Sequence, residues 1–170
     1  MQYDIYLLDA DDTLFDFDLA EEYALKQVFR NTDILYSEDI LRLYRKISEV
    51  LWEQFAEGNI TKEDLQARRF GELFFELNVK MNANQMNAAY VLALGAGSYL
   101  IDGAEEICKM LAENQKRIYI VTNGVAITQK MRIGNSSINQ YLTGVFLSED
   151  AGFPKPQKNI STMCFHKYPI

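Results

Sequence analysis

Three short apolar runs along the chain have the pattern of buried strands. Residues 5–8, 118–121 and 145–147 are continuously apolar and lack the alternation of a half-exposed strand. Such runs are typical of parallel sheets that are covered on both faces. Helical stretches precede the second run and separate it from the third, and the first of them begins at Asp102, where Glu105 stands at capping-box spacing. This order predicts a doubly wound, Rossmann-like α/β fold with a parallel sheet.

The segment between the first and second strands contains no strand-like run and is helical in pattern. Its apolar residues recur at the spacing of an amphipathic helix, which predicts a small helical bundle with its own core. Asp64 and Gln85 stand in the reciprocal capping position after two of the expected helix starts. The expected starts are Asp18, Ser37, Thr61 and Asn82, and the expected core positions are Leu25, Val28, Phe29, Leu43, Ile47, Val50, Leu51, Leu73, Phe74 and Leu77.

This pattern divides the chain into two domains. Residues 1–16 and 98–170 are expected to form the Rossmann-like core, and residues 17–97 to form the inserted helical bundle. The small residues at 95–98 include glycines, which permit backbone conformations closed to other residues. We expect this stretch to be the hinge between the two domains.

Composition and charge narrow the possible functions. The chain has 170 residues, of which 48% are hydrophobic and 24% charged, so it is long and apolar enough to bury a core. Its net charge of −7 argues against binding to a nucleic-acid polymer, because such binding depends on Lys and Arg that neutralise phosphates. A small phosphorylated substrate stays possible, since one local pocket can reverse the global sign.

The remaining bulk features concern the compartment. Cys108 and Cys164 cannot build a disulfide framework and lack metal-ligand spacing, which favours a reducing environment. The N-terminus has no cationic region of a secretory signal, and the longest largely apolar run, residues 88–101, is too short to span a bilayer. We therefore expect a cytoplasmic protein without a membrane partner.

The strongest chemical signal is an acidic cluster directly after the first strand. Asp9, Asp11 and Asp12 stand together, followed by Thr13. Acids packed so closely repel one another unless they share a cation. The alternative is a solvated turn whose acids cap a helix. An aspartate at a strand end can attack phosphorus in line, and an acid two residues later can protonate the leaving oxygen and then activate water.

The sequence Asp9-x-Asp11-x-Thr13-Leu14 after an apolar strand resembles the first motif of the haloacid dehalogenase (HAD) superfamily of hydrolases. The resemblance implies that Asp9 is the catalytic nucleophile and Asp11 the catalytic acid/base. The dehalogenases that gave the superfamily its name lack an acid at the second position, whereas its phosphatases and phosphomutases have one. Phosphoryl transfer is therefore favoured over cleavage of a carbon–halogen bond.

Two further motifs of the superfamily have counterparts here. Thr122 ends the second strand and precedes Asn123 and Gly124, so its hydroxyl and the following amides are expected to bind phosphoryl oxygens. Lys155, flanked by prolines after the third strand, matches the lysine that neutralises the nucleophile, Asp9, and the transferring phosphoryl group. Taken alone, residues 122–124 are a common turn and Lys155 is an ordinary solvated side chain. Their order behind the first motif favours a catalytic role.

The resemblance runs from residue 1 to about 158 and is closest to the noncanonical pyrimidine nucleotidases, a 5′-nucleotidase subgroup with a C1-type helical cap. Beyond the motifs, residues 51–52, 58–61 and 148–152 carry this similarity. It implies that the helical insert is a mobile cap that closes over the site, selects the leaving group and excludes water.

Three residues are assigned to substrate contacts on the same resemblance. These are Phe15 after the first motif and Lys62 and Arg69 in the cap. The alternative is that Lys62, Arg68 and Arg69 form a solvated helix face. Trp52 is expected to be a core residue rather than a platform for a base.

The superfamily's fourth motif, a pair of acids after a fourth strand, has no counterpart after Lys155. The resemblance therefore implies a C-terminally truncated chain with an incomplete sheet. Asp9 and the main-chain carbonyl of Asp11 are then the expected protein ligands of Mg²⁺, with waters completing its shell. The strand that carries Asp9 would form an apolar sheet edge, which predicts self-association.

The tail after Lys158 also departs from the family. A family member would begin an aromatic-rich helix there, whereas this chain continues with residues 159–170 in an unfamiliar order. Regrouping plausible codons by one base restores a family-like aromatic segment. We interpret the tail as a frameshift product.

These features together predict a Mg²⁺-dependent phosphatase. Its expected substrate is a small phosphorylated metabolite, first of all a nucleoside 5′-monophosphate, and its expected intermediate is an aspartyl-phosphate. The alternatives are a catalytically inactive, truncated binding module, a phosphatase of sugar phosphates and a phosphomutase. Release of phosphate in the presence of magnesium separates an enzyme from a binding module.

Overall fold

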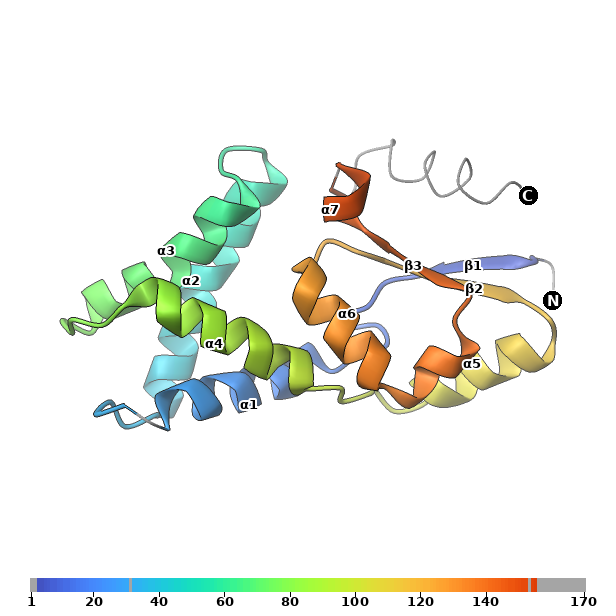
Figure 1. Ribbon diagram of the computed structural model, residues 1–170, viewed down its shortest axis with the longest axis horizontal. Coiled ribbons are helices and arrows are strands. Elements are labelled where there is room, and N and C mark those ends of the chain that lie inside the picture. Colours follow the sequence, from blue (N-terminus) through green and yellow to red (C-terminus); the bar gives the residue numbers. More distant parts are fainter. Residues whose placement is uncertain (1–2, 31, 153, 156–170) are drawn as a thin grey trace. The chain divides into compact units, whose positions relative to one another are not determined.

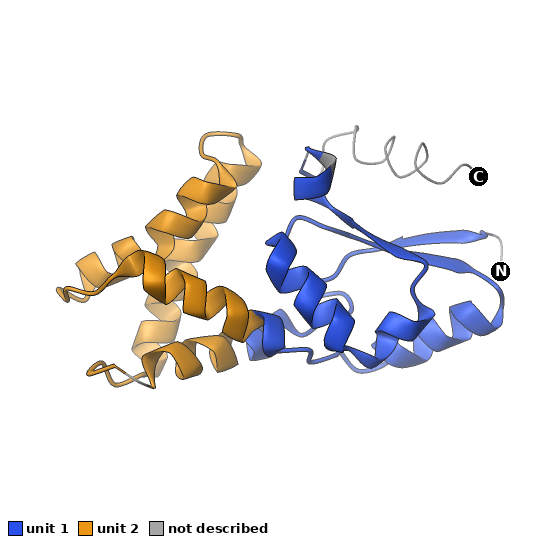
Figure 2. Ribbon diagram, viewed as in Figure 1, with its two compact units in different colours: residues 1–20, 95–170 blue, residues 21–94 orange. Residues whose placement is uncertain are grey.

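The computed structural model describes residues 3–30, 32–152 and 154–155, which form two compact units (Figure 2). One unit comprises residues 1–20 and 95–170, and the other comprises residues 21–94. The divisions fall a few residues inside the junctions expected at 16/17 and 97/98. Cys164 and the tail interpreted as a frameshift product lie outside the described residues.

The elements follow one another in the order shown in Figure 1. A strand opens the chain, four helices follow, and helices then alternate with two further strands. The bounds are β1 Ile5–Leu8, α1 Phe17–Phe29, α2 Glu38–Ala56, α3 Lys62–Glu76, α4 Ala83–Ala96, α5 Ala104–Glu113, β2 Arg117–Thr122, α6 Ala126–Asn135, η1 Ser137–Tyr141, β3 Gly144–Leu147 and α7 Ser148–Ala151.

The strands form a parallel sheet in the order β1-β2-β3, which confirms the predicted α/β fold. The middle strand, β2, is buried on both faces from Ile118 to Thr122. The two outer strands are not, because each has only one neighbour among the described residues: Leu7 of β1 is 41% exposed and Val145 of β3 is 37% exposed. Continuous apolar sequence therefore predicted full burial correctly for β2 only.

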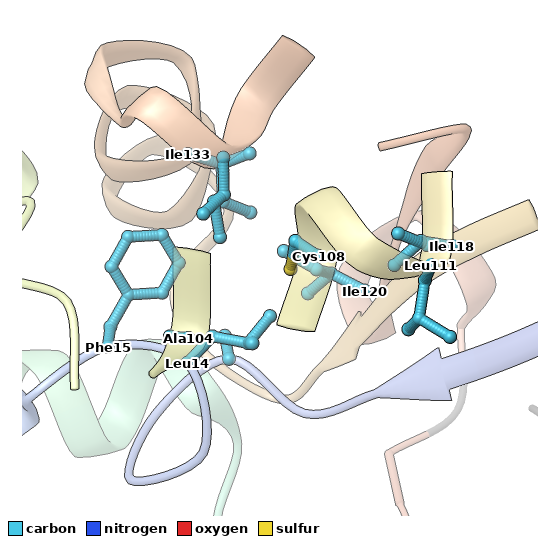
Figure 3. Close-up of a cluster of buried hydrophobic side chains, with 10 residues drawn as sticks. Leu14, Phe15, Ala104, Cys108, Leu111, Ile118, Ile120 and Ile133 are labelled. Atoms are coloured by element: carbon cyan, nitrogen blue, oxygen red, sulfur yellow. The ribbon is translucent and has the colours of Figure 1, made fainter. Parts of the chain in front are cut away.

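A hydrophobic cluster on one face of the sheet forms the core of the first unit (Figure 3). Ile118 and Ile120 of β2 contribute to it, while the alternate residues Tyr119 and Val121 pack with Phe146 on the opposite face. This alternation follows from the two-residue period of a strand. The labelled members in Figure 3 are Leu14, Phe15, Ala104, Cys108, Leu111, Ile118, Ile120 and Ile133.

Cys108 takes part in this cluster as a small apolar residue. It is fully buried and carries a free thiol. Burial raises the pKa of that thiol, which keeps it protonated and inert.

Helix α5 begins differently from the expected capping box at Asp102. The N-cap is Gly103, which has a left-handed backbone with φ of 86° and makes no side-chain capping bond. Asp102 stands one residue before this position, so its carboxylate does not occupy the N-cap. A left-handed turn is open to glycine at no steric cost, and this turn sets the start of the helix in place of a side-chain cap.

The helical starts follow the capping signals more closely in the second unit. Ser37 and Thr61 are N-caps of α2 and α3, and Thr61 forms a complete capping box with Asp64. The Asn82 side chain accepts a hydrogen bond from the Gln85 N–H over 3.1 Å at the start of α4. Within the described part of the chain, no helix is both long and apolar enough to cross a bilayer.

Helix α1 begins slightly earlier than expected. Its first residue is Phe17, and the Asp16 carboxylate accepts from the Leu19 N–H over 2.9 Å. Asp16 therefore has the capping role that was expected of Asp18. Asp18 lies in the first turn, where its negative charge interacts favourably with the helix dipole.

An aromatic cluster organises the core of the helical unit. The ring of Tyr44 lies 5.2 Å from that of Phe70 and 5.4 Å from that of Tyr90. These contacts set which face of α2 is buried, because Tyr44 is fully buried whereas Val50, an expected core residue, is 44% exposed. The buried residues of α2 are Ile40, Leu41, Tyr44, Ser48 and Leu51, a stripe rotated from the expected one.

The capping box at Thr61 generates a stability prediction. Replacement of Thr61 by Ala removes the acceptor for the Asp64 N–H, a bond of 3.0 Å, and we expect a loss of about 1 kcal/mol in the free energy of unfolding. Denaturant titration measures this change. Thr61→Ser is the matched control because it keeps the hydroxyl, and equal losses in both variants would contradict the capping argument.

Candidate active site

The acidic motif forms a tight turn after β1. Asp12 has a left-handed backbone with φ of 57°, and its N–H donates to the Phe15 carbonyl over 2.9 Å. The Ala10 carbonyl accepts from the N–H groups of Leu14 and Phe15 over 3.0 and 2.9 Å. Ala10, Leu14 and Phe15 are buried in the core cluster. Burial of these residues and the backbone hydrogen bonds hold the turn in place, so its acids stand on a rigid backbone.

The carboxyl ends of all three strands meet at this edge of the sheet. The last register pairs are Leu8 with Ile120 and Thr122 with Leu147. Parallel pairing therefore brings the motif after β1 beside Thr122 at the end of β2. Thr122 is buried, and its Oγ1 accepts from the Gly124 N–H over 3.0 Å. In doubly wound sheets this edge is where ligands bind.

Lys155 reaches the first acid of the motif. Its Nζ lies 2.6 Å from Oδ1 of Asp9, which also accepts from the Ala10 N–H over 2.8 Å. The backbone of Lys155 is held by Asn123: the Lys155 N–H donates to Asn123 Oδ1 over 2.7 Å, and Asn123 Nδ2 donates to the Lys155 carbonyl over 3.0 Å. The side chain of Asn123 thus clamps the lysine segment, a role that the sequence did not reveal.

Asp11 is held by two residues of α6 that sequence analysis missed. Gln129 Nε2 donates to Asp11 Oδ2 over 2.6 Å, and Arg132 Nη1 forms a close ion pair with Asp11 Oδ1. Gln129 and Arg132 are both buried. The available signal was a pair of polar side chains, three residues apart, on the apolar face of an otherwise amphipathic helix.

Comparison with known proteins identifies the family. The model of the family described as haloacid dehalogenase-like hydrolase matches residues 3–167. The chain belongs to this family. The match extends past residue 158, where the resemblance was expected to end.

The relatives of this chain include members of the family with more specific names. The HAD-hydrolase YfnB of Bacillus subtilis is 35% identical over 168 residues, covering 99% of this chain and 71% of YfnB. The pyrimidine 5′-nucleotidases PynA of Streptococcus pneumoniae and YjjG of Escherichia coli are each 29% identical, over 92% and 94% of this chain. The matched regions span 66% of PynA and 69% of YjjG.

The fold agrees with this family membership. A crystal structure of YfnB, described as bound to magnesium and as revealing interdomain movement, has a TM-score of 0.91 to this chain. The comparison covers 99% of this chain and 74% of the YfnB chain. The parallel sheet and its helices are therefore arranged as in a member of the HAD-like family.

The charges at the family motif are balanced largely by the protein itself. Asp9 faces Lys155, and Asp11 faces the buried guanidinium of Arg132. Partial burial and the neighbouring Asp11 carboxylate raise the pKa of Asp12. The sequence argument required a shared cation for this cluster, whereas two protein cations already pair with two of its acids.

A divalent cation would still find oxygen donors here. Among the described residues there is no group of three or more His, Cys, Asp or Glu side chains that could enclose a metal. The Asp9 side chain, however, is 45% exposed and offers carboxylate oxygen, the donor that Mg²⁺ prefers. Mg²⁺ is commonly bound through one or two carboxylates, with waters and substrate phosphate filling the remaining positions. The expected ligands, Asp9 and the Asp11 carbonyl, fit a site of that kind.

The burial of Phe15 gives no support to the expected substrate contact at this residue. Phe15 is fully buried in the core cluster, pairs with Leu100 through a β-bridge, and has Arg132 stacked over its ring with the guanidinium carbon 4.9 Å from the ring centre. Its ring supports the motif from inside and is not accessible to a substrate.

Lys62 and Arg69, expected to be cap residues, lie in the helical unit and are buried, so the alternative of a solvated helix face does not describe them. Lys62 Nζ lies 5.4 Å from the centre of the Phe55 ring. The Arg69 guanidinium stacks over Tyr90, and its Nε donates to Asn87 Oδ1 over 2.6 Å. Arg69 is thus packed into the core of this unit.

Arg68 and Trp52, also considered in the sequence analysis, are less buried than Lys62 and Arg69. Arg68 is the partly exposed member of the basic group and pairs with Glu72 over 2.8 Å. Trp52 is half-buried, and its ring meets Phe55 edge-on with the centres 5.7 Å apart. Trp52 therefore has an aromatic packing partner on its own helix.

The raised pKa of Asp12 generates a prediction about pH. Ionisation of the Asp12 side chain opposes folding at neutral pH. This penalty disappears below the pKa that Asp12 has in the unfolded chain, about 3.8. We expect Asp12→Asn to raise the melting temperature at pH 7, because Asn also tolerates the left-handed backbone. At about pH 3 the variant and parent should melt together. An equal difference at both pH values would contradict this cause.

Proposed function

We propose that the chain is a phosphatase that transfers the phosphoryl group of a small phosphorylated metabolite to Asp9 and then to water. The observation that carries the proposal is the 2.6 Å contact of Lys155 Nζ with Asp9 Oδ1 at the carboxyl edge of the sheet. A carboxylate beside a fixed cation is suited to receive a transferring dianionic group. Membership of a hydrolase family supports the same class of reaction.

The first step proceeds at Asp9. A carboxylate oxygen attacks phosphorus, the bond between phosphorus and the leaving oxygen breaks, and Asp11 donates a proton to that oxygen. Lys155 balances the charge of the transferring group. The Thr122 hydroxyl and the amides of Asn123 and Gly124, which leave the same edge, are proposed to bind the phosphoryl oxygens.

The second step hydrolyses the aspartyl-phosphate. Asp11, now ionised, takes a proton from water, the water oxygen bonds to phosphorus, and the bond from phosphorus to Asp9 breaks. Phosphate leaves, Asp9 is again a carboxylate, and Asp11 is again the protonated acid that the first step requires. Separation into two steps lets the same acid/base serve the leaving group and then the water.

Mg²⁺ is proposed as the cofactor, bound by the Asp9 carboxylate and the main-chain carbonyl of Asp11. It would supply positive charge that stabilises the transferring phosphoryl group. The magnesium in the YfnB structure supports this proposal. The helical unit, residues 21–94, is proposed to act as the cap over the site, and the interdomain movement described for YfnB supports mobility of that kind.

A nucleoside 5′-monophosphate is the proposed substrate. The names of PynA and YjjG, both pyrimidine 5′-nucleotidases, support this choice over a sugar phosphate. A release assay across pyrimidine and purine nucleotides and sugar phosphates, with Mg²⁺ and with a chelator, tests it. Preference for sugar phosphates would replace the substrate class, and binding without turnover would favour an inactive binding module.

The nucleophile generates the second functional prediction. Asp9→Asn should lower kcat by about 10³-fold or more, because an amide oxygen does not attack phosphorus, while the thermal stability stays near that of the parent. Asp4→Asn is the matched control. Asp4 lies just before the same strand, its side chain is exposed, and its carboxylate pairs with Lys116 over 2.7 Å, away from the acidic motif. Turnover of Asp9→Asn within about threefold of the parent would refute the assignment.

We also propose that the edge strand β1 pairs with a second copy of this chain. β1 is hydrogen-bonded on one side only within the described sheet, and Leu7 is 41% exposed on it. Sedimentation should show association that grows with protein concentration and falls in Leu7→Lys. Val145→Lys on the opposite edge strand is the control, and a monomer at all concentrations would exclude the pairing.

A further inference from the structure

The buried guanidinium of Arg132 is the centre of a network around Asp11. Arg132 is fully buried, its Nη1 pairs with Asp11, and its Nε donates to the Gly97 carbonyl over 3.1 Å. The guanidinium carbon lies 4.9 Å from the centre of the Phe15 ring and 5.9 Å from that of Phe17. Burial of a charge is costly unless it is paired, so Asp11 and Arg132 depend on each other.

Gln129 holds the other oxygen of the same carboxylate. Its Nε2 lies 2.6 Å from Asp11 Oδ2, and its side chain passes over Gly124. A Cβ at Gly124 would stand 2.2 Å from Nε2 of Gln129, which is too close for two non-bonded atoms. The absence of a side chain at Gly124 is therefore required for Gln129 to reach Asp11.

Both side chains are oriented toward Asp11 at a cost to their own hydrogen bonding. Nη2 of Arg132 and Oε1 of Gln129 are buried and have no hydrogen-bond partner among the described residues. A residue selected only to fill space would not leave such atoms unsatisfied, since each costs folding free energy. The arrangement instead gives each oxygen of Asp11 its own donor.

We propose that Gln129 and Arg132 are positioning residues that hold the Asp11 carboxylate in the orientation it needs to take a proton from water in the second step. The proposal rests on the proposed acid/base role of Asp11. Two donors from one rigid helix stop rotation of the carboxylate, while its side chain stays 28% exposed and open to the reacting water. Displacement of a catalytic group by about 1 Å can cost on the order of 10²-fold in rate.

Arg132 also fixes this geometry to the segments that connect the two units. Its Nε bond ends on Gly97, and the adjoining backbone is paired by the Asp16 N–H with the Tyr99 carbonyl and the Ile101 N–H with the Leu14 carbonyl, each over 3.0 Å. Asp11 is therefore held relative to the paired connecting segments of its own unit. A lysine at 132 keeps the charge but lacks the second donor that reaches Gly97.

Kinetics of three variants of the full chain test the proposal. Gln129→Leu, which keeps the size but loses the donor, and Arg132→Lys should each lower kcat by about 10- to 100-fold with KM within about twofold. Acid-quenched samples should contain more phosphoenzyme than the parent, because hydrolysis of the aspartyl-phosphate is the slowed step. Lys130→Met is the control on the same helix. Lys130 is exposed, and its Nζ lies 3.7 Å from a carboxylate oxygen of Asp150, which is also exposed.

Further measurements separate positioning from simple structural support. Gln129→Leu removes a buried unsatisfied oxygen, so its melting temperature should equal or exceed that of the parent even though kcat falls. In an Asp11→Asn background, neither substitution should lower kcat further, because the group they position is gone. Unchanged kcat in Gln129→Leu, or additive losses in the double variants, would overturn the proposal.

A readout without turnover keeps failure of this proposal distinct from failure of the proposed function. In ¹⁵N NMR spectra, Asp11→Asn should shift the side-chain resonances of Gln129 Nε2 and Arg132 Nε, and Asp4→Asn should not. If the parent and its variants hydrolyse no phosphate ester, the proposed function fails and the positioning role fails with it, even where these shifts occur. If the parent is active and the resonances do not respond to Asp11→Asn, only the positioning role fails.

Discussion

The parallel pairing of β2 with a strand on each side is the constraint on which the site depends. β2 is buried along its length, and its register with β1 and β3 makes the three strands end at one edge. Side chains that are more than a hundred positions apart in sequence thereby become neighbours. A slip of one residue in this register would turn Ile118 and Ile120 away from the core cluster, so burial of these residues also fixes the edge at which the acids stand.

Charge at that edge is balanced by cations from two other elements. Lys155 comes from the segment after α7 and meets Asp9, while Arg132 comes from α6 and meets Asp11. Their environments differ: Arg132 is fully buried, whereas both side chains of the Lys155–Asp9 pair are partly exposed. The first arrangement is suited to holding a group still, and the second leaves Asp9 open to the substrate that we propose it attacks.

The helical unit also contains buried charged side chains that are paired inside its core. Its core combines the rings of Tyr44, Phe70 and Tyr90 with the buried guanidinium of Arg69, which stacks on Tyr90 and is bonded to Asn87. Glu21 is buried as well and pairs with Arg45 over 2.8 Å. Buried polar groups of this kind cost free energy unless paired, and they restrict how the helices can pack.

Local sequence was sufficient for the elements and for the order of the motifs. Continuous apolar runs indicated the strands, side-chain caps at Ser37 and Thr61 indicated helix starts, and the acids after β1 indicated the family, because each of these signals lies within a few neighbouring residues. Where the local signal was ambiguous, tertiary packing decided. Apolar residues on several sides of α2 left its buried face open until Tyr44 met Phe70 and Tyr90, and the family pattern could not show that Phe15 is enclosed by the core. The same holds for Gln129, Arg132 and the Asn123 clamp, since hydrogen bonds between side chains far apart in sequence exist only after the strand register has brought their backbones together.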